Sequence, residues 1–255
     1  MGRIIVFIYG LVCYLIFVAT FLYAIGFTEN MVVPQSIDSG PSTPLGEAIL
    51  INALLLSLFV VQHTVMARPA FKAWWTRFVP KPAERSTFVL ATCVALGLVF
   101  WQWRPVTAVV WEVQNATLAN MLIGISLAGY GLVLYTSFCI DHFDLFGLRQ
   151  VVLYLQSKPY THPPFAQPLI YRLVRNPLML GFLIAFWVTP TMTQGHLIFC
   201  VLTTGYILMG IAFEERDLGI LLGDDYRRYR ARTPMLLPIP KSGKTVPAED
   251  SCASE

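Results

Sequence analysis

The segment 4–27 reads IIVFIYGLVCYLIFVATFLYAIGF and carries no charged side chain. A helix of about 20 apolar residues crosses the hydrocarbon core of a bilayer, and this segment is long enough to do so. It is too long for the apolar core of a signal peptide, and no clear small-residue cleavage site follows it. We therefore predict that the segment is retained as a first membrane-spanning helix.

The composition extends this interpretation to the whole chain. Of the 255 residues, 56% are hydrophobic and 13% are charged, whereas a soluble domain carries about 25% charged residues. Five cysteines occur without a CxxC pair, so neither a disulfide framework nor a zinc site is expected. Six segments are apolar enough to span a bilayer: 4–26, 46–67, 86–104, 118–140, 177–191 and 196–214.

These segments predict an all-α polytopic integral membrane protein. The fifth is short and ends at Thr189-Pro190-Thr191, and only a few residues separate it from the sixth. We therefore expect a tight helical hairpin at this point. A single domain is expected over residues 1–240, followed by a disordered polar tail over 241–255.

Loop charge predicts the orientation of the helices. The connections after the second and fourth segments and the C-terminal region are rich in Lys and Arg, and the first of these holds Arg68, Lys72, Arg77, Lys81 and Arg85. The other three connections carry only one basic residue, which is an arginine after the third segment. Because basic loops stay on the cytoplasmic side, both termini are expected in the cytoplasm.

Local signals mark several helix ends. Thr43-Pro44 is typical of an N-cap followed by proline at the first helical position, and Asn115 or Thr117 can cap the fourth segment. We expect the sixth helix to leave the membrane and continue to Gly223. Asp224 is then expected to cap a short basic helix.

Polar residues gather in four clusters on the expected cytoplasmic side: 141–150, 171–177, 214–217 and 224–230. Arg175 stands before Asn176-Pro177, where a helix begins and its free N–H groups attract anions. Glu214 and Glu215 follow an apolar run, where carboxylates are costly unless they are paired or hydrated. They form ion pairs with Arg216 or Arg175, or they bind hydroxyls or an amine of a cofactor.

Histidine supplies the candidates for proton transfer. His142 lies between Asp141 and Asp144, whose charges favour the protonated form of the ring. The other histidines are His63, His162 and His196, and they show no HxxxH or HExxH spacing, so no metal site is expected. No GxGxxG, GxSxG or GKS/T motif occurs, and the basic residues are too few for a nucleic-acid reader.

The C-terminal third carries a family resemblance. The stretches YRLVRNPLMLG (171–181), Glu214-Glu215, LLGDDYRRY (221–229) and the prolines at 234 and 238 resemble the isoprenylcysteine carboxyl methyltransferase and phospholipid methyltransferase superfamily. With DHFDLFGLRQ (141–150) and QHTVMAR (62–68), the chain looks like the bacterial methanethiol S-methyltransferase branch, close to the NnrU-like proteins. The resemblance covers about residues 60–250.

The resemblance implies an enzyme of the bacterial inner membrane that binds S-adenosylmethionine on the cytosolic side. It implies that Arg175 pairs with the methionine carboxylate of this donor, and that Glu214 and Glu215 bind its ribose or amino group. Tyr226 and Tyr229 would lie near the adenine or close over it. The implied cofactor-binding set is completed by Asn176, Arg149 and His162.

Two positions depart from the family pattern, because Asn176 stands in place of the usual histidine and Met179 in place of the usual tyrosine. Asparagine cannot act as a base at neutral pH. A thiol must lose its proton to become a strong nucleophile. His142, helped by Asp144, or alternatively Tyr171, is therefore the predicted base.

The sequence leaves more than one methyl acceptor and more than one function open. A small thiol such as methanethiol is the expected acceptor, and a phospholipid amine or a prenylcysteine carboxylate is the alternative within the same superfamily. A membrane sensor or transport accessory without catalysis is the third reading. The concentration of polar residues at one face, rather than near the middle of the bilayer, argues against a transporter. The sequence does not indicate the oligomeric state.

Overall fold

Five long helices dominate the computed structural model, which describes residues 2–161 and 168–239. Within these residues, five helices are long and apolar enough to cross a membrane: α1 (Arg3–Glu29), α2 (Leu45–Ala67), α4 (Lys81–Gln102), α5 (Ala116–Ile140) and α10 (Gln194–Leu222). They correspond to the first four predicted segments and the sixth. The all-α polytopic fold is confirmed. The predicted boundary at residue 240 and the tail beyond it lie outside the described residues.

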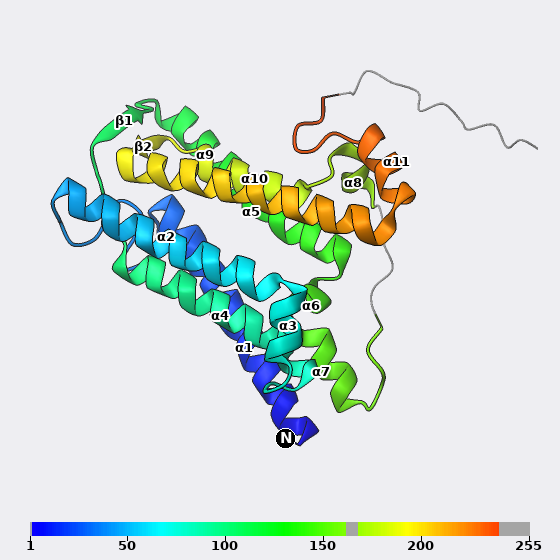
Figure 1. The fold of residues 1–255 in the computed structure, drawn as a ribbon. Helices are drawn as coiled ribbons and strands as arrows, with labels where there is room; N and C mark the ends of the chain where they lie inside the picture. Colours follow the sequence, from blue (N-terminus) through cyan, green and yellow to red (C-terminus); the bar gives the residue numbers. More distant parts are fainter. Residues whose placement is uncertain (1, 162–167, 240–255) are drawn as a thin grey trace, which may run out of the picture.

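The remaining helices are short, and most of them gather at one end of the long ones. Five short helices lie together near one end of α2, α5 and α10, and a ribbon of β1 (Val109–Glu112) and β2 (Thr191–Thr193) lies at the opposite end (Figure 1). The five are α3 (Pro69–Trp75), α6 (His142–Leu145), α7 (Leu148–Leu155), α8 (Leu169–Leu173) and α11 (Asp224–Arg232). We call the end with the short helices the inner end, following the prediction from loop charge.

The fifth predicted segment differs from the expectation. Helix α9 (Pro177–Trp187) has 11 residues and so is about 16 Å long, which is about half of the hydrocarbon core of a bilayer. The chain then forms β2 (Thr191–Thr193), which pairs antiparallel with β1 (Val109–Glu112). The predicted helix over 177–191 therefore ends four residues early, at Trp187. Helix α9 still packs against α10 as the expected hairpin, with the Trp187 ring N–H donating to the Thr204 hydroxyl at 2.9 Å. The link to α10 is a short strand held by a distant partner.

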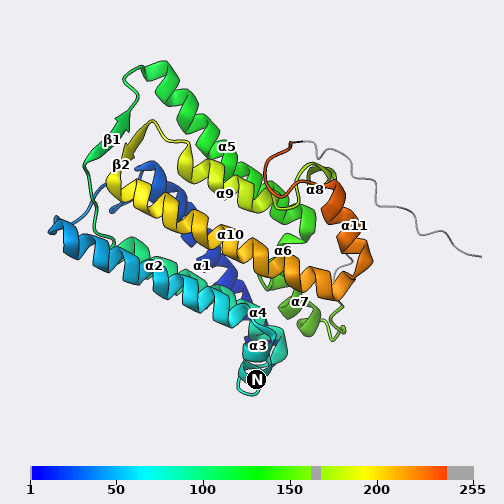
Figure 2. The same ribbon diagram turned by 45° about the horizontal axis from the view of Figure 1, so that its top comes forward.

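The long helices pack into two groups around α10. Helices α2 and α4 lie on one side of α10 and α5 and α9 lie on the other, while α1 packs on α4 and passes behind α10 (Figure 2). At the outer end a buried apolar cluster joins α1, α2, α4 and α10 through Phe27, Leu56, Phe100 and Phe199. Trp103, in the same cluster, donates from its ring N–H to the carbonyl of Ile37 at 2.9 Å. The outer ends of α1, α2 and α4 are thus joined to α10.

The helix ends test the predicted caps. Asn115 is confirmed as an N-cap, because its side chain accepts a hydrogen bond from the backbone N–H of Leu118 at 3.0 Å. Thr43 makes no cap, since α2 begins after Pro44 without a side-chain hydrogen bond. Helix α10 continues to Leu222 as expected. The cap position before α11 is taken by Gly223, with a φ of 56°, so Asp224 is the first helical residue rather than the cap.

Close contact between α5 and α9 depends on two glycines. A Cβ atom at Gly129 would lie 2.8 Å from the carbonyl oxygen of Gly181, and one at Gly181 would lie 2.8 Å from the carbonyl oxygen of Gly129. Both neighbours are backbone atoms, so they cannot move aside as a flexible side chain can. Small residues of this kind allow the backbones of membrane helices to approach closely.

Replacing one of these glycines tests the contact. Gly129→Val is expected to lower the free energy of unfolding by at least about 1–3 kcal/mol, the usual cost of overpacking. Thermal unfolding in detergent micelles measures the change. Gly131→Val on the same helix is the matched control, because a Cβ there meets nothing within 4 Å. Equal melting temperatures for the two variants would contradict the packing described here.

Candidate active site

A buried ion pair joins the start of α9 to the inner end of α10. The Arg175 guanidinium contacts the Glu215 carboxylate through Nη2 at 2.7 Å and donates from Nε to the same oxygen, Oε1, at 2.8 Å. The two side chains are only 5% and 7% exposed. Arg230 of α11 approaches the other oxygen, Oε2, at 3.3 Å. Charges this deeply buried are tolerated when they are paired and hydrogen-bonded.

The same arginine holds the segment that follows α11. Its Nη1 atom donates to the carbonyl of Arg230 at 3.1 Å and to the carbonyl of Thr233. The backbone N–H groups of Arg175 and Asn176 donate to the carbonyls of Pro234 and Met235 at 2.9 and 3.1 Å. All three nitrogen atoms of the guanidinium therefore have protein partners. Arg175 is engaged as a scaffold residue rather than left free for the carboxylate of a ligand.

The tyrosines predicted near the cofactor join α8 to α11. Tyr226 and Tyr229 are buried, and the Tyr229 hydroxyl donates to the carbonyl of Tyr171 at 2.6 Å. Burial and the neighbouring Tyr226 raise the pKa of Tyr229 to about 12. Burial, with Glu214 nearby, also raises the pKa of Tyr171 above its ordinary value of 10.0. Tyr171 therefore stays protonated at neutral pH, which speaks against its use as the base.

The two adjacent glutamates have different environments. Glu215 is buried against Arg175, whereas Glu214 is exposed and has no hydrogen bond or ion pair among the described residues. Asn176 donates to the carbonyl of Met235 at 3.3 Å and lies 3.5 Å from Glu215. The ion-pair reading therefore applies to Glu215, whereas cofactor binding by Glu214 stays a prediction. Glu215 is paired with Arg175, and Glu214 is left accessible.

His142 lies in a second cluster at the inner end. The ring is 4% exposed, and Phe138 stacks on it at a centroid distance of 4.2 Å. Its Nδ1 atom is 2.7 Å from the Ser137 hydroxyl, and its Nε2 atom is 2.9 Å from the Tyr14 hydroxyl. Ser137 donates its only hydroxyl hydrogen to the carbonyl of Leu134, so it accepts from Nδ1–H. The Nε2 lone pair consequently faces the Tyr14 hydroxyl, which donates to it.

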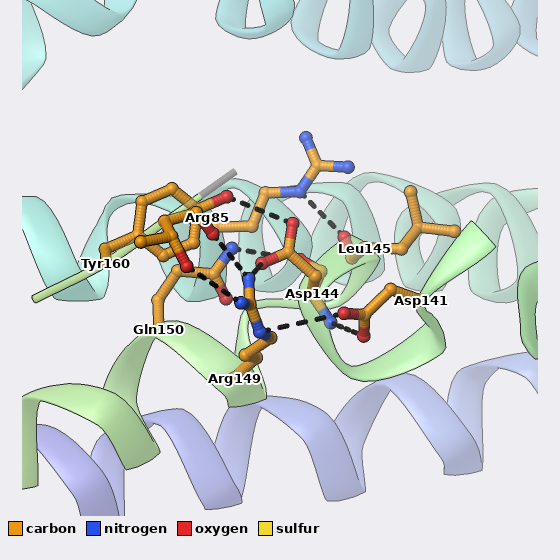
Figure 3. Close-up of polar contacts among 8 residues, drawn as sticks. Arg85, Asp141, Asp144, Leu145, Arg149, Gln150 and Tyr160 are labelled. Atoms are coloured by element: carbon orange, nitrogen blue, oxygen red, sulfur yellow. Dashed lines mark hydrogen bonds and ion pairs between the residues drawn. The ribbon is translucent and has the colours of Figure 1, made fainter. Parts of the chain in front are cut away.

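Asp144 has other partners than the predicted one. It accepts from Arg149 Nη1 at 2.9 Å and from the Tyr160 hydroxyl at 3.1 Å (Figure 3). Asp141 lies 3.6 Å from Arg149 Nε, and Arg149 also donates to the carbonyl of Thr161 at 2.8 Å. Asp144 therefore does not hydrogen-bond to His142 as expected, and the ring is held by Ser137 and Tyr14 instead. Arg149 is held by two carboxylates.

A cavity of about 600 Å³ lies beside this second cluster. Its lining comes from α3, the first turns of α4, the end of α5, α6, α7 and the residues after α7. Asp141 and Asp144 contribute to it, as does Arg85, which sequence reasoning counted only as a basic loop residue. Tyr14 was also missed, because a tyrosine within an apolar run gives no local signal of a polar role. His162 lies outside the described residues.

The fold and the site define a polytopic integral membrane protein whose polar clusters meet at one end of its helices. Over 240 residues the chain is 53% identical to methanethiol S-methyltransferase 1 of Bradyrhizobium diazoefficiens, spanning 94% of this chain and 84% of that protein. It is 52% identical over 240 residues to the methanethiol S-methyltransferase of Mycobacterium tuberculosis, spanning 94% and 98%. The chain therefore belongs to the methanethiol S-methyltransferase family.

A more distant likeness agrees with the wider superfamily. The chain is 32% identical over 199 residues to nurim of Rattus norvegicus, spanning 74% of this chain and 73% of that protein. No family model and no solved structure matches the sequence.

Proposed function

We propose that this protein transfers a methyl group from S-adenosylmethionine to methanethiol and so forms dimethyl sulfide. The observation that carries the proposal is identity above 50% to two methanethiol S-methyltransferases across 94% of the chain. The gathering of titratable side chains at the inner end supports it. When bound, the donor supplies an activated methyl group on a sulfonium, so the protein need not provide a nucleophile of its own.

Removal of the thiol proton is then the task of the protein, and His142 is the proposed base. Burial lowers its pKa below the ordinary 6.5, against an opposing effect of Asp141. The ring is therefore neutral at pH 7, with its Nε2 lone pair directed at Tyr14. In the proposed relay, Tyr14 passes its hydroxyl proton to Nε2 of His142 and takes up the proton of the thiol. The thiol thereby becomes a thiolate. The aromatic rings around His142 keep water away from this step.

Donor binding is proposed on the accessible groups near the Arg175–Glu215 pair. The Glu214 carboxylate is suited to ribose hydroxyls, and the Tyr171 hydroxyl, kept protonated, donates a hydrogen bond. In this proposal Arg175, Asn176, Glu215 and Tyr229 position these groups by fixing α8, α10 and α11 against one another. Arg149 is likewise proposed to position Asp141 and Asp144 through its two ion pairs.

The setting is proposed to be the bacterial inner membrane, with both termini and the inner end of the helices in the cytoplasm. This orientation rests on the basic loops, which all lie at the end where the polar clusters gather. S-Adenosylmethionine is made in the cytosol, so the donor meets this end of the molecule. Methanethiol is apolar and soluble in a bilayer, which gives a site at the membrane boundary ready access to it.

A headspace assay tests the proposal. Membranes containing the protein, given methyl-labelled S-adenosylmethionine and methanethiol, are expected to release labelled dimethyl sulfide, and membranes without the protein are not. Label that appears instead in extracted lipid would favour a phospholipid amine or a prenylcysteine carboxylate as acceptor. Label in neither fraction would contradict a methyltransferase and favour a sensor or transport accessory.

The proton relay is tested by a matched pair of tyrosine variants. Tyr14→Phe is expected to lower kcat about 100-fold, the scale of general base catalysis, while donor binding is retained. Tyr135→Phe, at a 55% exposed position on α5, is expected to leave kcat unchanged. Because protonation of His142 removes the base, wild-type kcat/KM should fall as the pH drops below 6.5. Full activity of Tyr14→Phe across the pH range would refute the relay.

A further inference from the structure

One arginine at the inner end has N–H donors that meet no acceptor among the described residues. The Arg85 Nε atom donates to the carbonyl of Leu145 at 2.7 Å, and its side chain lies over the Phe88 ring at 5.0 Å. Its two terminal nitrogens have no hydrogen bond or ion pair to any residue that the structure describes. In Figure 3 they point away from Asp144 and Asp141, and no contact to them is drawn. Arg149 and Arg175, by contrast, are held by carboxylates.

The partner of Arg85 is expected inside the cavity that it lines. Glu84 and Asp144 supply opposite charge near Arg85, but half-buried N–H donors that lack an acceptor are unfavourable, and a bound anion removes that cost. Guanidinium also matches the planar geometry of a carboxylate and binds it through two parallel hydrogen bonds. Lys72 and Lys81 line the same cavity and add positive charge. The cavity is therefore suited to an anionic group.

Negative charge in the same lining narrows the class of ligand. Glu84, next to Arg85, lines the cavity without an ion pair among the residues described. Asp141 and Asp144 contribute two further carboxylates. A dianionic phosphate would be repelled by these groups. An α-amino acid presents a carboxylate and an ammonium side by side, which matches Arg85 and Glu84. The volume of about 600 Å³ lies in the range of small-molecule sites.

We propose that this cavity binds the amino-acid end of the methyl donor, with Arg85 on its carboxylate and Glu84 facing its ammonium. The inference rests on the proposed function. It moves the carboxylate partner from Arg175, which the family resemblance implied, to Arg85, because Arg175 is already neutralised by Glu215. The sulfonium charge of the donor then lies toward Asp141 and Asp144, on the side of the cavity next to His142.

Decarboxylated S-adenosylmethionine gives the sharpest test, because it lacks only the carboxylate. Dissociation constants of both donors are measured by calorimetry on the purified full-length protein. Wild type is expected to bind the decarboxylated donor about 10- to 100-fold more weakly, the scale of a charged hydrogen bond. Arg85→Gln is expected to bind both donors equally weakly. Arg77→Gln is the matched control and keeps the wild-type preference, because Arg77 is exposed and does not line the cavity.

The outcomes separate this inference from the proposed function. If Arg85→Gln still prefers the carboxylated donor, Arg85 does not bind the carboxylate and the inference is overturned, whereas methyl transfer stands. If wild type binds neither donor, the proposed function fails with it. Should Arg85→Gln unfold, Arg85→Lys replaces it. That variant keeps the charge but loses the paired geometry, so it should show a smaller preference than wild type, and an undiminished preference overturns the inference.

Discussion

The contact between Arg175 and Glu215 is the interaction on which the inner end of the molecule depends. Two charges that are only 5% and 7% exposed are taken out of water, and each is tolerable only because the other is there. The pair fixes the start of α9 against α10, and the remaining donors of Arg175 hold the chain after α11. Residues that are far apart along the sequence are thereby fixed around Glu214, Tyr171 and the tyrosines of α11.

The helices were predictable because their signals are local. The apolar length of each long segment fixes a span, and a single residue such as Asn115 marks where a helix begins. The end of α9 at Trp187 was not predictable in this way. Thr193 lies between the two predicted apolar segments, 177–191 and 196–214, and it becomes part of a strand by pairing with Val109. Such pairing between distant residues leaves no trace in a window of neighbouring residues.

Some contacts of the candidate site could likewise be predicted from the sequence, and others could not. Charged residues in an apolar setting must find partners, so the meeting of Arg175 with Glu215 could be anticipated from the sequence. Proximity in sequence was a poor guide for His142, because Asp144 lies two positions away yet binds Arg149 and Tyr160, while the histidine binds Tyr14 from α1. Arg85 was hidden among loop arginines, and only the cavity distinguishes it from them.

A double-mutant cycle on Arg175 and Glu215 tests the central claim most directly. Unfolding free energies in detergent are compared for wild type, Arg175→Met, Glu215→Gln and the double variant. Each single variant is expected to lose about 3–5 kcal/mol, because it leaves a buried charge or polar group uncompensated. The double variant should lose much less than the sum, with a coupling of about 3 kcal/mol. Losses that simply add would mean that the pair does not hold the inner end together.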